Sequence, residues 1–588
     1  MIEIRDPYRR RIHKKTLLLV CLLLAWFLII AGRLVDLQVL QHSRLKAQVI
    51  EQNSLKSDII PKRGNIFDRN GIVLALSLPL PSVFYVPLKD EPAAGHRAKI
   101  NRLKKALSLT DKDIQKIMAR VEGHDTFVWI KRTISQAEYE SVKRLAVPGI
   151  SFREENKRFY PLGPLAAHVL GGVGVDDVGL SGVELKYNEL LKGINGQSQI
   201  LWDARKRKYQ IETLKDPKPG KPLTLTIDQI IQHSAERELR RAVEETRANW
   251  GTVVISNPAS GEILAMAGFP TYDPNAYPDV SREAEVNRAV RHNFEPGSTF
   301  KIVTAAAARE YGASRLTDTF DCREGKIRVA GWTIEDHEKL GVLTFPEVFI
   351  HSSNVGSIQV GLRLARGEFY NAIQAFGFGR KTEVGLPGEE KGILRPVDKW
   401  SKTSLAALSI GYEVSVTAVQ VLQALNVIAN RGFLIPLRIV KETPVPAAGP
   451  AAPGYPAPRI VSERTAAEVK DILERAVAEG TGREAVIEGF SIAGKTGTAQ
   501  KIDPALGGYS ARKHLSAFAG FVPSEKPLLS MVIILDEPKG TLYYGGQVAA
   551  PLFRDIARNV LLYLREPPRE IPKAEAIIAA RLPDRRTP

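Results

Sequence analysis

A serine and a lysine three residues apart are the strongest candidates for chemistry in this 588-residue sequence. Ser298 and Lys301 follow Pro296-Gly297, and residues 302–308 behind them are apolar or small at nearly every position. This pattern predicts a buried helix that begins near Ser298. Residues three apart share a helix face, so the two side chains can touch there. A lysine whose pKa is lowered by burial can act as the base that a serine nucleophile needs.

The Ser-x-x-Lys spacing is weak evidence by itself, because it occurs twice more. Ser43 and Lys46 form one copy, and Ser510 and Lys513 form the other. Neither copy has the preceding Pro-Gly pair or an apolar helix behind it, so we expect both to be solvent-exposed.

A second motif, Ser352-Ser353-Asn354, is the only Ser-x-Asn in the chain. The Ser352 hydroxyl could relay a proton from Lys301 to a leaving amine. The Asn354 amide could hold both a substrate carbonyl and the lysine. Taken alone, the motif is better interpreted as a turn or a helix cap.

A third motif, Lys495-Thr496-Gly497-Thr498, contains the only Lys-Thr-Gly of the chain. On an edge strand, it would offer a cation and hydroxyls to a substrate carboxylate. Gly497 has no side chain, so a substrate could approach the backbone closely. The alternative interpretation is a glycine bulge in an ordinary strand.

The elements around these motifs indicate one α+β domain whose sheet joins distant segments, because strands lie at both ends of the region and helices between them. The hydrophobic pattern predicts strands over 223–227, 251–255, 263–267, 515–521 and 528–535, and helices over 228–246 and 550–564. Upstream, strands over 83–86 and 127–130 and a helix over 113–120 indicate mixed structure. The Pro/Ala/Gly-rich residues 443–458 predict an exposed loop.

An uncharged apolar run over 16–32 predicts a membrane-spanning helix. Basic residues precede it, so the positive-inside rule keeps the amino terminus in the cytoplasm and everything after residue 40 outside the membrane. A cleaved signal peptide is the alternative, but residues 29–33 offer a poor cleavage site. We therefore favour an uncleaved anchor.

The composition excludes several classes of protein. Apolar residues make up 44% and charged residues 25% of the chain, which is ordinary for a globular protein. Lysine and arginine number 82 against 65 acidic residues, a net charge of +17. This balance can favour anionic partners, but an extracytoplasmic location argues against nucleic acid. Two cysteines exclude a disulfide framework and a four-cysteine zinc site. We expect no metal and no cofactor.

Together, the three motifs match the signature of class A β-lactamases and penicillin-binding proteins. The chain resembles a class B penicillin-binding protein of the division (septal) type. Residues 63–71, 158–171 and 179–184 are similar to the structural motifs of that family's pedestal. The resemblance implies that Arg63, Asp68, Arg69 and Glu184 form buried ion pairs.

Two features favour the division branch over the elongation branch. Val355-Gly356 follows the Ser-Ser-Asn motif where elongation enzymes tend to carry Asp, and Lys-Thr-Gly stands where they tend to carry Lys-Ser-Gly. A sporulation paralogue would look alike.

The resemblance implies an α+β fold with a single transmembrane helix, an elongated mixed α/β pedestal domain and a penicillin-binding/serine β-lactamase-like transpeptidase domain, which has an antiparallel sheet with helices. We expect a cytoplasmic tail over 1–15, the anchor over 16–36, a pedestal of the dimerisation type over 37–220, the transpeptidase domain over 221–565 and a flexible tail over 566–588.

The implied reaction is cross-linking of peptidoglycan stem peptides. Ser298 would attack the penultimate D-alanine, Lys301 would act as base and Ser352 would protonate the departing D-alanine. The backbone N–H groups of Ser298 and Thr498 would form the oxyanion hole. Lys495, Thr496 and Thr498 would hold the terminal carboxylate, Gly497 would allow close approach, and Asn354 would position the peptide. A β-lactam would trap Ser298.

The implied partners are a membrane glycosyltransferase of the SEDS type and other division proteins. Three alternatives stay open: a membrane-anchored β-lactamase or β-lactam sensor, a D,D-carboxypeptidase and a non-catalytic division scaffold. A second, glycan-polymerising activity is disfavoured, because residues 41–220 contain no Glu-Asp-x-x-Phe-x-x-His motif. Glu335-Asp336-His337 matches it only superficially and lies in the wrong region.

Overall fold

The computed structural model describes residues 7–45, 48, 54–87, 91–123, 125, 127–174, 176–202, 208–441, 457–503 and 507–568. The chain divides into two compact units. The first comprises Met1–Pro61 and Gly193–Pro219, and the second comprises Lys62–Lys192 and Gly220–Pro588. The predicted loop over 443–458 and the tail over 566–588 lie almost entirely outside the described residues.

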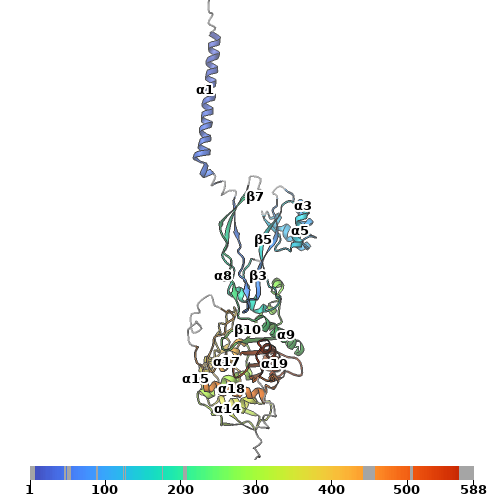
Figure 1. The fold of residues 1–588 in the computed structure, drawn as a ribbon, viewed down its shortest axis with the longest axis vertical. Helices are drawn as coiled ribbons and strands as arrows, with labels where there is room; N and C mark the ends of the chain where they lie inside the picture. Colours follow the sequence, from blue (N-terminus) through green and yellow to red (C-terminus); the bar gives the residue numbers. More distant parts are fainter. Residues whose placement is uncertain are drawn as a thin grey trace, which may run out of the picture. The chain divides into compact units, whose positions relative to one another are not determined.

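The first unit contains a long apolar helix and a small sheet. Helix α1 (Pro7–Val35) continues into a π-helical turn at Asp36–Leu40 (Figure 1). By length and composition, the stretch Arg11–Leu40 could cross a membrane. Strands β1 (Ser54–Ile59), β6 (Gly196–Trp202) and β7 (Lys208–Lys215) form an antiparallel sheet.

In the second unit, residues 62–192 build a sheet with helices beside it. Its elements are β2 (Ile66–Phe67), β3 (Val73–Tyr85), α3 (Ala93–Leu103), α4 (Asp111–Glu122), β4 (Val128–Lys131), α5 (Gln136–Leu145), β5 (Ile150–Phe159), α6 (Ala167–Leu170), α7 (Gly182–Lys186) and α8 (Asn188–Leu191). The long strand β3 pairs with both β4 and β5. Figure 1 shows α3 and α5 side by side next to β5.

Local sequence explains where two of these helices start. Thr110 begins α4 with a capping box to Asp113, and Ser135 begins α5 with a capping box to Glu138. Each box satisfies backbone N–H groups that a helix start otherwise leaves free. The apolar faces of α3 and α4 then pack on β3 and β4 in one core.

Buried charges join three segments of this region. The Glu184 carboxylate lies 2.6 Å from both Arg63 Nε and Arg158 Nε, and all three side chains are nearly inaccessible. The predicted ion pair is wrong for Asp68, and the ion pair of Arg69 is present but only partly buried. Asp68 accepts backbone N–H groups of a turn and of α9, and Arg69 forms a partly exposed pair with Glu262.

The main sheet of the second unit has the order β10-β9-β19-β18-β17 and is antiparallel throughout. Its strands are β9 (Trp250–Ser256), β10 (Ile263–Phe269), β17 (Ala493–Asp503), β18 (Gly508–Val522) and β19 (Leu529–Asp536). Every residue of β9 and β19 is buried, because helices cover both faces of the sheet. The predicted pairing of distant segments into one sheet is therefore confirmed.

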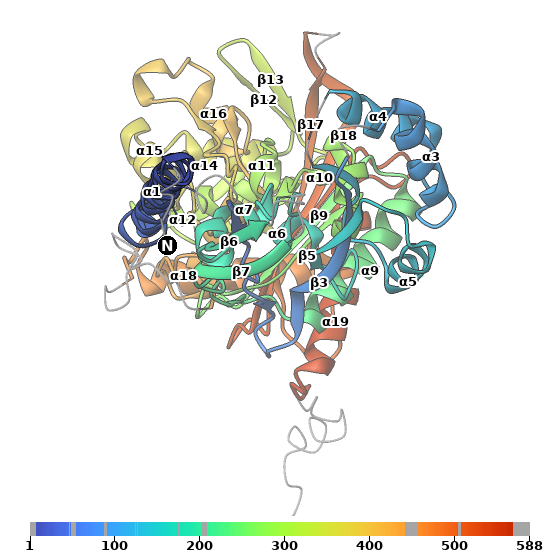
Figure 2. The ribbon, with the colours of Figure 1, turned by 90° about the horizontal axis from the view of Figure 1, so that it is seen from above.

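Helices α9 (Gln229–Thr246) and α19 (Gly545–Tyr563) cover one face and contact each other. Helices α12 (Lys301–Glu310), α17 (Ala418–Ala429) and α18 (Glu463–Ala478) pack in the core of the other face. Figure 2 shows α12 and α18 on the side of the sheet away from α9 and α19.

Shorter elements complete this unit. They are β8 (Leu223–Thr224), α10 (Arg282–Glu285), α11 (Arg288–Arg291), β11 (Thr319–Asp321), β12 (Lys326–Val329), β13 (Trp332–Glu335), β14 (Val342–Thr344), α13 (Phe345–Ile350), α14 (Asn354–Gly361), α15 (Arg366–Ala375), β15 (Ile393–Leu394), α16 (Ser404–Ser409) and β16 (Val414–Ser415). Three antiparallel pairs form among these strands: β11 with β14, β12 with β13, and β15 with β16.

The Ser-x-x-Lys copy at the start of β18 differs from our expectation of full exposure. Ser510 is buried, and its hydroxyl accepts the backbone N–H groups of Arg512 and Lys513 within strand β18. Lys513 pairs with Asp503 instead of approaching the serine. The copy thus lies where the register between β17 and β18 shifts, and its serine and lysine have separate partners. Lys46 of the other copy lies outside the described residues.

Candidate active site

The predicted nucleophile lies on a short 3₁₀ turn, η3 (Gly297–Phe300), that leads directly into α12. The expected buried helix is present, but its α-helical part starts at Lys301 and not at Ser298. The backbone N–H of Lys301 donates to the Ser298 carbonyl. Since side chains three apart eclipse in a 3₁₀ turn, Ser298 and Lys301 share a face. Ser298 is half-buried and Lys301 is fully buried.

Two glycines in the left-handed region hold this turn in place. Gly297 has φ +52° and donates its N–H to the Gly411 carbonyl. Gly411 has φ +82°, and a Cβ there would lie 2.1 Å from the Gly297 carbonyl oxygen. Glycine adopts such angles without steric cost, so these two residues allow the backbones to approach closely beneath the nucleophile.

The amine of Lys301 is the centre of the hydrogen bonds in the site. Its Nζ donates to the Ser352 carbonyl at 2.7 Å, to Asn354 Oδ1 at 2.9 Å and to Ser352 Oγ at 3.4 Å. Among the described residues, none of its hydrogen bonds goes to Ser298 Oγ. The structure thus brings together Lys301, Ser352 and Asn354 as predicted, with Ser298 one turn away on the same backbone.

Burial lowers the pKa of Lys301 to about 7, and the negative charge of Asp336 opposes part of that shift. Within the described residues, no carboxylate forms an ion pair with Lys301. At neutral pH, a large fraction of its amine is therefore unprotonated and able to accept a proton.

Ser352 adopts a conformation that serine rarely takes. Its φ is +61°, in the left-handed region, which costs about 1–3 kcal/mol for a residue with a side chain. The next residue, Ser353, caps α14 by accepting the Gly356 N–H. The cap that the motif suggested is thus real, but Ser353 makes it and not Ser352.

Asp336 fixes this loop, a role that the sequence analysis did not predict. One carboxylate oxygen accepts the backbone N–H groups of Asn354 and Val355, and the other accepts the Ser353 hydroxyl at 2.7 Å. A carboxylate at a helix start is also favoured by the helix dipole. The only signal in the sequence was an acidic residue after strand β13, which does not reveal a partner that lies 18 residues later.

The third motif lies on β17, which is an edge strand of the main sheet as predicted. Lys495 is buried, and its Nζ donates to the Thr496 carbonyl at 3.3 Å. Burial and the nearby charge of Lys301 hold the pKa of Lys495 well below its usual value. The two amines, nearly 200 positions apart in the chain, therefore act on each other.

The register of β17 shows no bulge at Gly497, which pairs with Ala517 of β18 in an unbroken run. The bulge interpretation of this glycine is therefore wrong. A Cβ at Gly497 would lie 2.8 Å from Thr299 Cγ2, so its small size lets β17 pack against η3.

The two threonines of the motif already have hydrogen-bond partners. Thr496 shares a hydrogen bond of 2.7 Å with Thr481, and Thr498 Oγ1 accepts the Gly545 N–H at the start of α19 at 3.0 Å. Each hydroxyl keeps further donor or acceptor capacity.

A row of aromatic rings lies beside these motifs. His514 of β18 stacks on Tyr543, and Tyr543 stacks on Tyr544, with ring centroids 4.5 Å and 4.4 Å apart. Tyr544 then contacts His337, next to Asp336. Sequence reasoning missed this row, since its members come from three separate segments.

Within the described residues, no group of three or more histidine, cysteine or acidic side chains is arranged to hold a metal ion. The groups that the motifs bring together are a hydroxyl, amines, amides and backbone N–H donors. This set can support acyl transfer through a serine.

Comparisons with known proteins agree with this site. A family model described as the penicillin-binding protein transpeptidase domain matches residues 251–558, and one described as the penicillin-binding protein dimerisation domain matches residues 58–225. One similar solved structure is the crystal structure of penicillin-binding protein 3 from Mycobacterium tuberculosis, complexed with aztreonam. It matches with a TM-score of 0.65 and 29% sequence identity, and the match covers 87% of this chain and 99% of the Mycobacterium tuberculosis chain.

Two curated relatives span most of the sequence. Peptidoglycan D,D-transpeptidase FtsI of Escherichia coli is 31% identical over 92% of this chain and 90% of its own length. Stage V sporulation protein D of Bacillus subtilis is 34% identical over 92% of this chain and 85% of its own. With the matched models, the sheet and the three motifs around Lys301, they show that the chain belongs to the class B penicillin-binding proteins.

Proposed function

We propose that the chain is a peptidoglycan D,D-transpeptidase that acts through an acyl-enzyme on Ser298. One observation carries the proposal. Ser298 shares a single turn with Lys301, whose buried amine donates hydrogen bonds to Ser352 and Asn354. The printed activity of the Escherichia coli relative supports the same reaction.

In the proposed first step, Ser298 Oγ attacks the carbonyl carbon of the penultimate D-alanine of a stem peptide, and Lys301 Nζ takes the hydroxyl proton. The backbone N–H groups of Ser298 and Thr498 donate to the oxyanion, where each such donor contributes about 3–4 kcal/mol. The C–N bond then breaks, and Ser352 relays the proton held by Lys301 to the nitrogen of the departing D-alanine.

Binding of the donor peptide is assigned to β17 and α14. Lys495, Thr496 and Thr498 hold the terminal carboxylate, and Asn354 orients the peptide beside Gly497. An amine of a neighbouring strand then attacks the acyl carbon and loses a proton to Lys301. The bond between the acyl carbon and Ser298 Oγ breaks, the proton returns to Oγ, and the cross-link is formed. A β-lactam resembles the D-Ala-D-Ala end and stops at the acyl-enzyme, in agreement with the aztreonam complex of the relative.

Labelling with a fluorescent penicillin tests the nucleophile. We expect Ser298→Ala to abolish labelling of the full-length protein in detergent, and Ser43→Ala, the serine of another Ser-x-x-Lys copy, to leave it unchanged. Labelling that survives in Ser298→Ala, or a peptide mass that places the adduct elsewhere, would refute the assignment.

The hydrolytic alternatives differ in the lifetime of the acyl-enzyme. A transpeptidase keeps its penicillin adduct, whereas a β-lactamase would turn over nitrocefin rapidly. A D,D-carboxypeptidase would release D-alanine from a pentapeptide without an amine acceptor. Intact-mass spectra after penicillin and after pentapeptide with and without acceptor separate the three.

We further propose a role in septal wall synthesis, beside a SEDS-type glycosyltransferase and other division proteins. The FtsI relative supports this role, while the relative named for stage V sporulation supports a sporulation role as second candidate. Depletion in the native host should give filaments without septa, and a defect confined to spores would favour the second candidate. Failure of Ser298→Ala to restore growth would exclude a pure scaffold.

The same proposal includes the arrangement along the chain: a cytoplasmic tail over 1–15, an anchor over 16–36, a pedestal over 37–220, the transpeptidase domain over 221–565 and a tail over 566–588. Proteolysis of intact spheroplasts should cut residues beyond 40 and spare an amino-terminal tag. The reverse pattern would overturn the orientation.

A further inference from the structure

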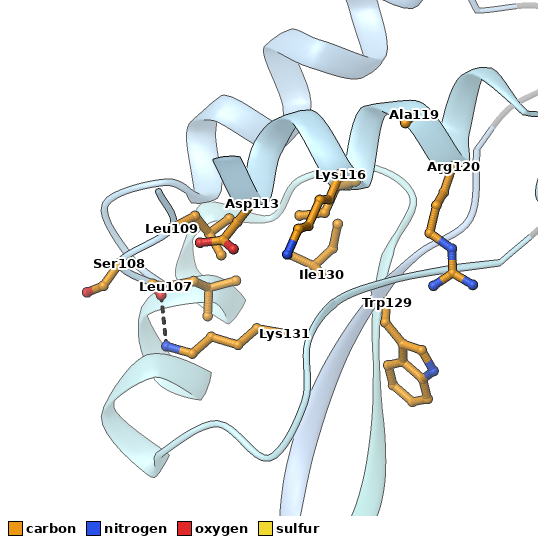
Figure 3. Close-up of a pocket in the computed structure, with 11 residues that line it drawn as sticks. Leu107, Ser108, Leu109, Asp113, Lys116, Ala119, Arg120, Trp129, Ile130 and Lys131 are labelled. Carbon is orange, nitrogen blue, oxygen red and sulfur yellow. Dashed lines mark hydrogen bonds between the residues drawn. The ribbon is translucent and has the colours of Figure 1, made fainter. Parts of the chain in front are cut away.

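A hollow lies between helix α4 and strand β4, in a part of the chain that the proposed reaction does not use. It has a volume of about 700 Å³, within the size range of ligand sites. Leu107, Ile117 and Ile130 contribute apolar lining, and Trp129 stands at one end. Figure 3 shows Lys116 and Arg120 pointing from α4 toward the hollow.

Strand β4 is an edge strand, and the hollow lies against it. It pairs with β3 on one side, and in the described residues no other strand pairs with it. An edge strand with free backbone groups is a template for pairing with another chain. Its four residues, at about 3.3 Å each, would match a partner segment of similar length.

One face of β4 also carries aromatic surface. Phe127 is 38% exposed, and its ring lies 4.8 Å from that of Trp129 and 4.6 Å from that of Phe84 on β3. The alternate residues Val128 and Ile130 are buried in the core. A strand added to β4 could therefore rest alternate side chains on an existing aromatic surface.

The charged side chains around the hollow that are not held by a close partner within the protein are positive. Lys131 is paired with Glu138 and the Leu107 carbonyl, so it is already satisfied. Asp113 accepts from Thr110, and these hydrogen bonds lower its pKa.

The two remaining cations are exposed on α4. Lys116 has no ion pair among the residues that the structure describes, and Arg120 has only an exposed pair of 3.4 Å with Asp125. Acidic side chains would complement both.

We propose that this hollow binds an extended, acidic segment of a partner protein, which adds as a strand to the free edge of β4. Backbone hydrogen bonds to β4 supply affinity. Apolar side chains of the segment rest on Phe127 and Trp129, and acidic ones pair with Lys116 and Arg120. Peptide grooves between an edge strand and a helix, as in PDZ and PTB domains, use the same physics. A second copy of this chain is disfavoured, since its own α4 would bring like charges.

The test uses full-length protein in detergent and fluorescein-labelled, capped decapeptide pools. In the acidic pool, Glu alternates with Val, Ile or Tyr, and in the matched pool Lys replaces Glu. By fluorescence anisotropy, we expect the acidic pool to bind and the basic pool to bind about tenfold more weakly or not at all. Absence of binding by the acidic pool, or equal binding of both, overturns the proposal.

Charge-reversal variants locate the site. Lys116→Glu/Arg120→Glu should raise the Kd of the acidic pool about tenfold. Lys105→Glu/Lys112→Glu makes the same change in net charge at exposed positions outside the hollow, and it should change the Kd less than about twofold. Equal effects of the two variants would indicate non-specific attraction and refute the site.

Backbone methylation tests strand addition. Two versions of the acidic pool are N-methylated at every second amide, one at the odd and one at the even positions. Alternate N–H groups of a strand face the same side. One version should therefore lose binding, and the other should retain it. Binding of both versions, or loss in both, contradicts strand addition. A concentration-dependent dimer that the acidic pool does not dissociate would assign the edge to a second copy instead.

Discussion

At the scale of single residues, the protonation of Lys301 limits when the site can react. A protonated Lys301 cannot take a proton from Ser298, and its pKa is about 7. We therefore expect the rate constant of acylation by penicillin to fall about tenfold per pH unit below pH 7 and to level off above it. Stopped-flow labelling from about pH 5.5 to about 8.5 measures this profile.

Substitution of the lysines separates this effect from general changes in charge. Lys301→Arg keeps the charge but cannot give up its proton, so acylation should be lost at every pH. Lys513→Arg, at the lysine of another Ser-x-x-Lys copy, should leave both rate and profile unchanged. A flat profile in the unaltered protein would rule out Lys301 as the base.

Asp336 has two separable effects on the same site. Its charge raises the pKa of Lys301 in part, and its carboxylate holds the backbone of Asn354 and Val355. In Asp336→Asn, the acid limb of the acylation profile should move to lower pH. The plateau should fall about 10- to 150-fold, corresponding to the 1.5–3 kcal/mol of a lost charge-assisted hydrogen bond.

The exposed neighbour Glu338→Gln provides the control for Asp336, and it should change neither quantity. A fall in rate without a shift in the profile would mean that Asp336 acts through the loop alone. An unchanged rate would show that the loop keeps its place without the carboxylate.

At the scale of elements, the position of η3 depends on Gly411. Gly411→Ala would combine a strained positive φ with a Cβ 2.1 Å from the Gly297 carbonyl oxygen. The Gly297 carbonyl belongs to the backbone and cannot move without moving η3. We therefore expect η3 to shift and acylation to slow by about tenfold or more. The variant should also lose more than about 1 kcal/mol of unfolding free energy.

A matched control exists at the other end of α12. Gly312 has φ +68°, but a Cβ there would meet nothing within 4 Å. Gly312→Ala therefore carries the strain without the clash, and it should lose about 1 kcal/mol of stability with normal acylation. Urea unfolding and penicillin labelling measure the two quantities, and equal behaviour of both variants would contradict the steric argument.

The elements that sequence analysis predicted well are those with local signals. Strands β9 and β10 flank the Asn257–Gly261 turn, and α9 has an aspartate cap and an apolar stripe. The start of α19 was expected at 550, whereas it begins at Gly545. A glycine is needed at that start, because a Cβ at Gly545 would lie 2.3 Å from the Gly497 carbonyl oxygen.

The site was predictable only where short motifs carry it. Ser298 and Lys301 share one turn, so local spacing placed them together. Asp336 and the aromatic row around Tyr543 reach the site through long-range packing, and single-sequence patterns do not encode such contacts. The sheet of the first unit was not predicted for the same reason, because it pairs residues before 61 with residues after 193.

At the scale of the whole molecule, the buried cluster around Glu184 holds together three segments that are far apart in the sequence. Arg63 and Arg158 each donate to its carboxylate at 2.6 Å, with almost no solvent contact. Glu184→Gln would remove the carboxylate that both guanidinium groups pair with, and only the buried Asp177 carboxylate would remain near them. We expect a loss of about 3–5 kcal/mol in unfolding free energy, because removing one partner of a buried ion pair strands the others.

The exposed Glu189, which pairs with the partly exposed Lys192, supplies the contrast, since Glu189→Gln should leave the unfolding free energy nearly unchanged. Urea unfolding of the full chain, followed by intrinsic fluorescence, compares the two variants. Penicillin labelling at low temperature should proceed normally in folded Glu184→Gln, because the cluster lies outside the catalytic motifs. Equal stability of the two variants would show that the cluster does not hold these segments together.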